Sequence, residues 1–233
     1  MGEYIFECEN VFKSYGTTLA LDNVSFKVKP GEVVGLLGPN ASGKSTLIKL
    51  AMGMLQANDG KILIDGKTPG AETKKITAYL PDANYLYNWM TVDQQVKYYA
   101  DFFKDFNIDK CDALLNRLQI AKKQKIRSLS KGTKEKLGLI LTMSRDAQLY
   151  ILDEPIAGVD PAARDFILDT VMSNRAEGST IFLCTHLIAD IEPILTQAIF
   201  LNRGKIALDA PVAEVKEKEG KSLDEVFREV FKW

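Results

Sequence analysis

One short run of glycine, small polar residues and a lysine limits the possible folds of this chain more than any other segment. Residues 38–46 read Gly-Pro-Asn-Ala-Ser-Gly-Lys-Ser-Thr, which matches the pattern G-x-x-x-x-G-K-[ST] of a phosphate-binding loop. The run 32–37 before it predicts a buried strand, and a helix should follow with Leu47 and Met54 on its apolar face. A glycine-rich turn between strand and helix exposes backbone N–H groups at the positive end of the helix dipole. The motif in this setting therefore predicts a nucleotide-binding site.

Most residues of this loop are expected to contact the nucleotide. The predicted contact residues are Gly38, Asn40, Ser42, Gly43, Lys44, Ser45 and Thr46. Lys44 is expected to reach the β- and γ-phosphates and to act in catalysis, and the hydroxyl of Ser45 is expected to hold Mg²⁺.

Composition limits the classes of protein to which this chain can belong. The chain has 233 residues with 46% hydrophobic content, enough for an α/β domain with a smaller attachment. Its 30 lysines and arginines balance 31 aspartates and glutamates, so no global basic field favours nucleic acid, and we expect no nucleic-acid partner. Three widely spaced cysteines are typical of reduced thiols in a cytosolic protein. No apolar run approaches the ~20 residues that span a bilayer, so a membrane role would have to come from a partner.

The predicted elements divide the chain into a β-rich start, a helical middle and an α/β end. Short β-type runs are predicted at 5–7, 24–28, 33–37, 60–66, 76–80, 149–152, 180–183, 198–201 and 205–208. Residues 91–144 have a helical pattern, in which Leu114, Leu115 and Leu118 should start an amphipathic run. A charged helical tail closes the chain.

This order predicts an α/β fold with a mainly parallel sheet, an N-terminal antiparallel β region and an inserted helical subdomain. The expected boundaries are 1–83 and 146–209 for the core, 84–145 for the helical subdomain and 210–233 for the tail.

Two adjacent carboxylates, Asp153 and Glu154, follow the apolar strand 149–152. Open α/β sheets bind ligands at the carboxyl ends of their strands, where the phosphate loop also lies. We expect Asp153 to hold Mg²⁺ through a water molecule and Glu154 to act as the general base toward the attacking water. The alternative is a solvent-facing acidic turn, but two charges at the end of a buried strand are costly unless a cation or ligand meets them.

The segment Leu129-Ser130-Lys131-Gly132-Thr133 resembles the Leu-Ser-Gly-Gly-Gln signature of the ABC ATPase family. By itself Ser130 is also a good helix cap. Its place between a helical insertion and the Asp-Glu strand is typical of the family. The resemblance implies that Ser130 and Gly132 contact a nucleotide bound by a second subunit.

Other single residues match positions of the family pattern, in the same order along the chain. Tyr15 matches the aromatic that stacks on adenine, although a lone aromatic also suits a core. Asp160 matches a loop that touches the opposite subunit and also precedes a helix as an N-cap. His186, the single histidine, occupies the place of the γ-phosphate contact. Asp82 stands where the family usually has glutamine and is expected to serve catalysis and Mg²⁺, whereas Ala41 replaces a common glycine.

The chain thus resembles the ATP-binding subunit of an ABC transporter. The resemblance implies ATP and Mg²⁺ as ligands, ATP hydrolysis, and a head-to-tail dimer with itself or a paralogous ATPase subunit. It also implies a separate transmembrane permease that holds the chain on the cytoplasmic, inner face of the cell membrane. The segments 186–192 and 222–227 resemble bacterial drug- and peptide-exporter ATPases, which favours export of drug-like, antimicrobial-peptide or lipid-like substrates. The alternative is a soluble ABC-type ATPase that acts in assembly or scaffolding without a permease.

Two stretches have two interpretations each. The aromatic-rich segment 84–90 either packs the helical insertion or contacts a partner. The basic cluster formed by Lys122, Lys123, Lys125 and Arg127 is either a solvated face or a source of phosphate attraction.

Overall fold

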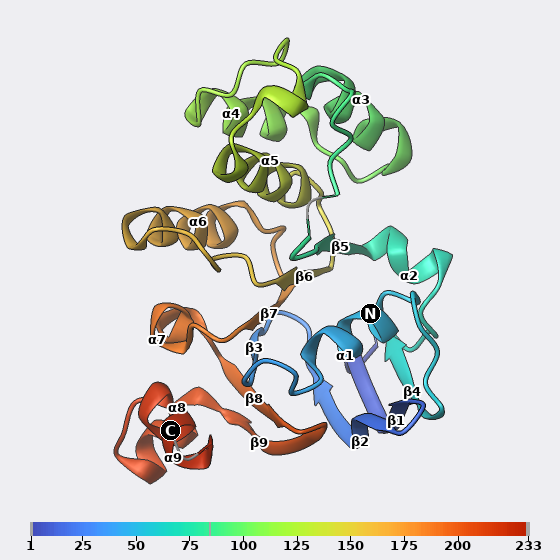
Figure 1. Ribbon diagram of the computed structural model, residues 1–233, viewed down its shortest axis with the longest axis vertical. Helices are drawn as coiled ribbons and strands as arrows, with labels where there is room; N and C mark the ends of the chain where they lie inside the picture. Colours follow the sequence, from blue (N-terminus) through green and yellow to red (C-terminus); the bar gives the residue numbers. More distant parts are fainter. Residues whose placement is uncertain (1, 84, 232–233) are drawn as a thin grey trace.

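The structure is a computed structural model that describes residues 2–83 and 85–231, and it is built on two β-sheets (Figure 1). In spatial order, the larger sheet consists of β5 (Thr77–Leu80), β6 (Leu149–Asp153), β7 (Thr180–Thr185), β3 (Val33–Leu37), β8 (Gln197–Asn202) and β9 (Lys205–Pro211). Its strands run parallel except for β9, which pairs antiparallel with β8. The smaller sheet is antiparallel, in the order β2 (Thr18–Val28), β1 (Phe6–Tyr15) and β4 (Asp59–Ile64). The predicted fold class is confirmed.

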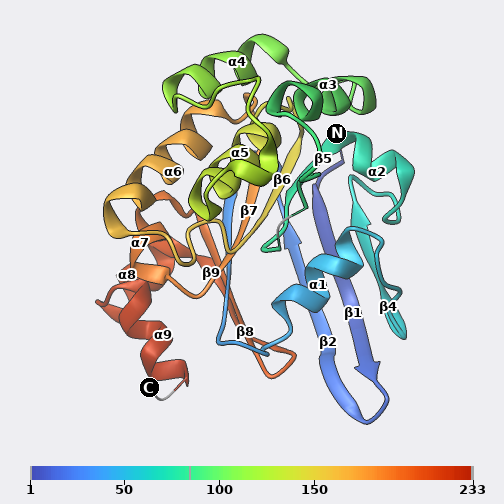
Figure 2. The same cartoon turned by 45° about the horizontal axis from the view of Figure 1, so that its top comes forward.

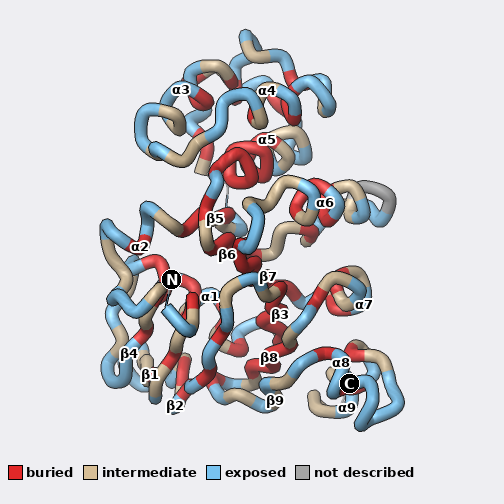
Figure 3. The backbone as a smooth tube through the Cα atoms, turned by 180° about the vertical axis from the view of Figure 1, so that it is seen from behind, coloured by how far each residue is buried: buried red, intermediate tan, exposed pale blue. Residues whose placement is uncertain are grey.

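Helices and the second sheet cover both faces of the larger sheet. Its strands β3, β6 and β7 are buried at every position (Figure 3), as expected for a parallel sheet with two covered faces. One face packs against α5 (Lys131–Met143), α6 (Pro161–Asn174), α7 (Ile188–Ile191), α8 (Val212–Glu219) and α9 (Leu223–Phe231). The other face packs against α1 (Lys44–Ala51) and the antiparallel sheet (Figure 2). Stacked rings of Phe6, Phe26 and Phe182, with centroids 5.1 to 6.1 Å apart, join the two sheets.

A helical layer lies beyond β5 (Figure 1). It contains α3 (Val92–Phe102), α4 (Ile108–Arg117), the short helix η1 (Ile126–Ser128) and α5. The layer has its own apolar core, and α5 contributes side chains both to this core and to the core beneath the sheet. The helical insertion is therefore present, while the exact boundaries expected at 83, 145 and 209 stay predictions.

Arg145, which follows the C-cap of α5, links this layer to the sheet. Its side chain is 3% exposed and its guanidinium donates to the Thr77 carbonyl at 2.6 Å and to the Asp105 carboxylate at 2.9 Å. The guanidinium also lies 3.9 Å from the ring centroid of Phe103. Because its donors are paired, this buried charge is tolerated, and it links the edge strand β5 to the segment between α3 and α4.

Several element boundaries differ from those expected. The β1–β2 hairpin is longer than the runs 5–7 and 24–28, because its outward-facing positions are polar and only its inner face is apolar. A short helix, α2 (Ala71–Ile76), replaces the start of the strand expected at 76. Leu114 lies in the last turn of α4, which ends before Gln119 at φ +54°. Likewise α1 ends before Gly53 at φ +62°, so Met54 is exposed rather than on the helix face.

Two further expectations concern the cysteines and the membrane. Cys8, Cys111 and Cys184 are free and buried. Across residues 2–83 and 85–231, no helix is both long and apolar enough to cross a bilayer.

Candidate active site

The phosphate loop connects buried β3 to α1, and two of its glycines are sterically required. A Cβ on Gly38 would lie 2.3 Å from the Leu201 carbonyl oxygen of β8. Gly43 has φ +114°, and a Cβ there would lie 2.6 Å from the carbonyl oxygen of Ala20 in β2. Strands from both sheets therefore press against the loop and hold its shape.

Ala41 carries the other unusual backbone angle of this loop. Its φ is +63°, in the left-handed region that glycine adopts readily and alanine only with strain. This backbone angle suits the glycine that the resemblance implies at this position. Alanine here costs on the order of 1 kcal/mol.

The loop presents donors that suit an anion. The first backbone bond of α1 runs from the Leu47 N–H to the Gly43 carbonyl at 3.0 Å, so the N–H groups of residues 43–46 precede the intrahelical ladder. The ammonium of Lys44 donates to the carbonyls of Gly38 at 2.7 Å and Pro39 at 3.1 Å, which lays it along the loop. Within the described residues the buried Ser42 hydroxyl finds no hydrogen-bond partner. These donors fit phosphate.

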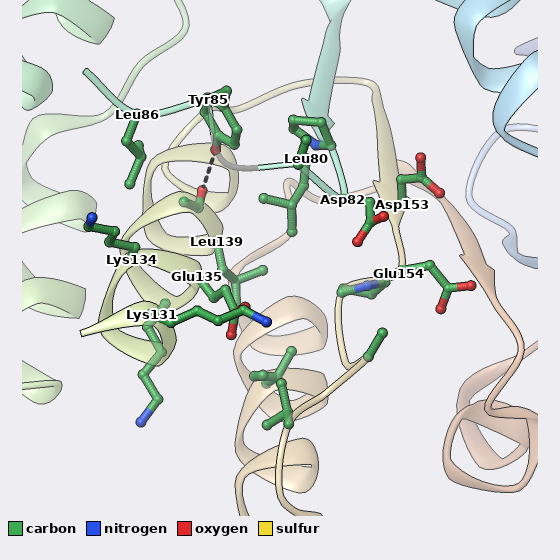
Figure 4. Close-up of a pocket in the computed structure, with 18 residues that line it drawn as sticks. Leu80, Asp82, Tyr85, Leu86, Lys131, Lys134, Glu135, Leu139, Asp153 and Glu154 are labelled. Carbon is green, nitrogen blue, oxygen red and sulfur yellow. Dashed lines mark hydrogen bonds and ion pairs between the residues drawn. The ribbon is translucent and has the colours of Figure 1, made fainter. Parts of the chain in front are cut away.

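Carboxylates gather at the neighbouring strand ends. Asp153 ends β6, and Asp82 follows β5, whose Leu80 pairs in register with Leu152. Figure 4 shows Asp82, Asp153 and Glu154 grouped at this edge. Asp153 is 7% exposed, and its pKa is raised from 3.8 to about 6, first by burial and then by the charges of Asp82 and Glu154. A bound cation would relieve this crowding of negative charge.

The expected Mg²⁺ residues lie together. Ser45, Asp82 and Asp153 line one pocket, and hydroxyl and carboxylate oxygens are ligands that Mg²⁺ prefers. However, among residues 2–83 and 85–231 no group of three histidine, cysteine, aspartate or glutamate side chains is placed to hold a metal ion. These residues therefore fit Mg²⁺ only where phosphate and water oxygens complete its coordination.

Glu154 and His186 meet directly. The pairing of β6 with β7 places Asp153 opposite Cys184, so the residues that follow lie side by side. Nδ1 of His186 is 3.0 Å from Oε1 of Glu154, and the Thr185 hydroxyl donates to Oε2 at 3.0 Å. Glu154 adopts φ +51° and its N–H donates to the Cys184 carbonyl at 2.7 Å. The carboxylate is thus oriented by two neighbours, and Thr185 is a site residue that the motifs did not indicate.

The remaining predicted residues lie on the surface. Ser130 caps α5, accepting a bond from the Thr133 N–H at 3.1 Å. Gly132, in the first turn of α5, is exposed, and a Cβ there would meet no atom within 4 Å. Tyr15 is 47% exposed at the end of β1, so its core interpretation is wrong. Asp160 precedes α6, and its carbonyl accepts the first bond of that helix from the Arg164 N–H at 3.2 Å. The helix-cap positions of Ser130 and Asp160 are therefore present, and both residues are exposed.

The structure also shows the environment of the two stretches that had two interpretations, the aromatic segment and the basic cluster. Tyr85 donates to the Gly138 carbonyl at 3.0 Å and Leu86 is buried, whereas Tyr87 and Trp89 are exposed. The aromatic segment thus both packs the helical layer and faces solvent, and its residue Asn84 lies outside the described residues. In the basic cluster, the ammonium of Lys122 pairs with Asp112, which favours a solvated face.

Residues 21–157 match the family model of the ABC transporter. The chain belongs to the ABC transporter family. It is 33% identical, over 84% of its length, to an uncharacterised ABC transporter ATP-binding protein of Synechocystis, of which it spans 58%. It is 29% identical to the SkfA peptide export ATP-binding protein SkfE of Bacillus subtilis, over 98% of both chains. A solved structure of the ATP-binding subunit of an ABC transporter superposes with a TM-score of 0.88 and 29% identity, covering 97% of this chain and 99% of the other.

The matched region of the ABC protein contains the phosphate loop, the signature and the Asp-Glu strand. ATPase domains of this family bind ATP and hydrolyse it in transport, so the chain is an ABC-type ATP-binding subunit and ATP hydrolase. The resemblance inferred from the motifs is confirmed. The individual residue roles stay predictions.

Proposed function

We propose that this ABC ATPase is the motor subunit of an exporter. It pairs head to tail with itself or a paralogous subunit around two ATP molecules with Mg²⁺, and it drives a separate transmembrane permease from the cytoplasmic face of the membrane. The observation that carries the proposal is the exposed signature: Ser130 and Gly132 stand at the start of α5 in the helical layer, while the phosphate loop belongs to the sheet layer (Figure 1). A site that uses both is completed by a second copy.

Within each site the chain's own residues bind, orient and move a proton. The loop N–H groups and Lys44 hold the phosphates, Tyr15 stacks on the base, and His186 contacts the terminal phosphate. Ser45, Asp82 and Asp153 would hold Mg²⁺, which would neutralise negative charge on the phosphates when bound. Glu154 accepts a proton from the attacking water, with its carboxylate held by His186 and Thr185. Ser130, Gly132 and Asp160 reach the nucleotide of the opposite subunit.

An exposed aromatic patch is the proposed contact with the permease. We define the aromatic patch as Tyr87, Trp89, Tyr98 and Phe102. Trp89 and Phe102 are 66% and 68% exposed, and neighbouring rings of the patch lie 5.4 to 6.2 Å apart. Exposed aromatic side chains in contact with one another are typical of protein interfaces. Tyr87 and Trp89 of this patch follow Asp82 closely in the chain, which would connect the permease to the nucleotide site.

The export direction is supported by two observations. The relative of similar length, SkfE, is named for peptide export. The segments 186–192 and 222–227 resemble exporter ATPases, so a drug-like, antimicrobial-peptide or lipid-like substrate is proposed.

The shared site is tested by mixing two inactive variants. Lys44→Ala disables the phosphate loop and Ser130→Arg disables the signature, so each variant alone should lose ATPase activity. A mixed dimer contains one site with both halves intact, and the mixture should regain a clear fraction of the wild-type activity. As a matched control, mixing Lys44→Ala with Glu154→Gln should stay inactive, because both changes damage the same half of a site. An inactive first mixture, under conditions where wild-type dimers form, would contradict the head-to-tail proposal.

A further inference from the structure

The terminal helix α9 is fixed firmly against the sheet. Leu223 is fully buried, and its N–H donates to the Glu192 carboxylate at 3.1 Å. The ring of Phe227 packs edge-on against Phe200 of β8, with centroids 5.3 Å apart. The outward-facing side chains of α9 therefore have a defined position relative to the nucleotide site.

Those side chains share a pocket with the phosphate loop. A hollow of about 600 Å³ is lined by Pro39, Asn40, His186, Asp224, Phe227 and Arg228. Figure 2 shows α9 beside the loop that joins β3 to α1. One wall of the pocket thus comes from the loop and the strand-end histidine, and the other comes from the tail.

Arg228, on the wall of the pocket that the tail forms, has an ion-pair partner that another anion can replace. Its guanidinium pairs with the Asp224 carboxylate one helical turn away at 2.6 Å, and its side chain is 65% exposed. An exposed pair of this kind contributes little free energy, so a stronger anion can replace Asp224. Phosphate is such an anion, since guanidinium binds two of its oxygens in a planar fork.

We propose that Arg228 contacts the terminal phosphate of bound ATP and so makes the tail sensitive to whether ATP or ADP is bound. The inference rests on the nucleotide site of the proposed function. The terminal phosphate is favoured because the pocket contains His186, the residue expected at that phosphate, and the first residues of the loop rather than the helix N-terminus. ADP lacks this group, so Arg228 then keeps its partner Asp224.

The test measures nucleotide affinity rather than turnover. ATP and ADP, each with Mg²⁺, are titrated calorimetrically into chains that all carry Glu154→Gln to prevent hydrolysis. Arg228→Ala should weaken ATP binding about fivefold, the loss of one exposed charge-assisted contact, and should leave ADP binding unchanged. Arg228→Lys should be intermediate, because lysine keeps the charge but loses the fork. Asp224→Asn removes the competing partner and should strengthen ATP binding.

The control is Lys218→Ala, which removes an exposed cation of the same tail outside this pocket and should bind both nucleotides normally. Normal ATP binding by Arg228→Ala, or an equal loss for ATP and ADP, overturns the inference. If Arg228→Ala fails to fold, Arg228→Lys and Asp224→Asn still decide, because unchanged ATP affinity in both also overturns it. Failure of the proposed site itself is seen separately, as absent nucleotide binding before any change to the tail.

Discussion

Replacing Asp153 with asparagine should stabilise the nucleotide-free protein while disabling it. Asp153 is nearly buried at the end of β6, with Asp82 and Glu154 beside it, and its pKa is raised from 3.8 to about 6. At neutral pH the folded chain must therefore hold a carboxylate charge that its surroundings disfavour. Asparagine keeps the shape of the side chain and removes that charge.

The size of the effect follows from the pKa. A rise from 3.8 to about 6 corresponds to about 3 kcal/mol at 1.36 kcal/mol per unit. The effect of the neighbouring Lys44 and Lys49 is already contained in this pKa, and screening by solvent at the edge of the site reduces the free energy further. We therefore expect a gain of about 1–3 kcal/mol in the free energy of unfolding at pH 7.5. For a chain of this size the gain raises Tm by roughly 2–10 °C.

The pH dependence has a definite sign. Because the pKa of Asp153 is higher in the folded than in the unfolded chain, its protonation stabilises the fold below pH 3.8, and this stabilisation is lost as pH rises through about 6. At pH 5 the wild type regains about half of the free energy of unfolding that the charge of Asp153 costs it at pH 7.5. The difference in stability between Asp153→Asn and the wild type should therefore shrink by about half. Chemical denaturation of both chains at pH 7.5 and pH 5 measures this difference.

The same chains with Mg²⁺ and ATP provide the functional comparison. Nucleotide at 100 times its Kd should stabilise the wild type by about 2.7 kcal/mol and Asp153→Asn by less. As a control, Asp101→Asn removes an exposed carboxylate of α3 and should change stability by less than about 0.5 kcal/mol. An Asp153→Asn variant that is less stable than wild type at pH 7.5 without nucleotide, or a difference independent of pH, would refute the reasoning.

Two further predictions concern catalysis and the permease. Glu154→Gln should bind ATP normally, hydrolyse it at least about a hundredfold more slowly and accumulate as an ATP-bound dimer in gel filtration; near wild-type turnover would remove Glu154 from the mechanism. Tyr87→Ala and Trp89→Ala should keep the ATPase activity of the isolated subunit but weaken permease binding in co-purification, whereas Asp82→Ala should lower hydrolysis in the isolated subunit. Normal permease binding and transport by both aromatic variants would place the docking surface elsewhere.

The sequence predicted the fold best where a motif by itself requires a particular order of elements. The strand, loop and helix around residues 38–46 were predictable because the motif itself requires that order. The placement of Asp82 near Asp153, and of His186 beside Glu154, followed from the rule that parallel strands end at one edge of the sheet. Element ends were less predictable, since Gln119 and Gly53 stop their helices through backbone angles that apolar spacing does not reveal.

Long-range contacts were hidden from the sequence. In the sequence Arg145 resembles an ordinary surface cation. In the structure it is buried by contacts with Asp105 and Thr77, which lie 40 and 68 residues away in the chain. The sharing of a pocket by Arg228 and Asn40 likewise depends on how α9 docks on β8. Ala41 satisfies the general motif, which allows any residue at that position, so only its φ of +63° reveals the backbone strain.

Asp82, which stands where the family pattern has glutamine, changes the charge balance of the whole site. A glutamine there would be neutral, whereas Asp82 is the largest charge contribution to the raised pKa of Asp153, with Lys44 acting in the opposite direction. The edge of the sheet therefore holds more negative charge than the usual family pattern would give it. Since Lys44 is also needed by the phosphates, it cannot fully neutralise both Asp153 and a nucleotide. A divalent cation would supply the missing positive charge for both. This chain should therefore depend more strongly on Mg²⁺ for nucleotide binding than an Asp82→Gln variant.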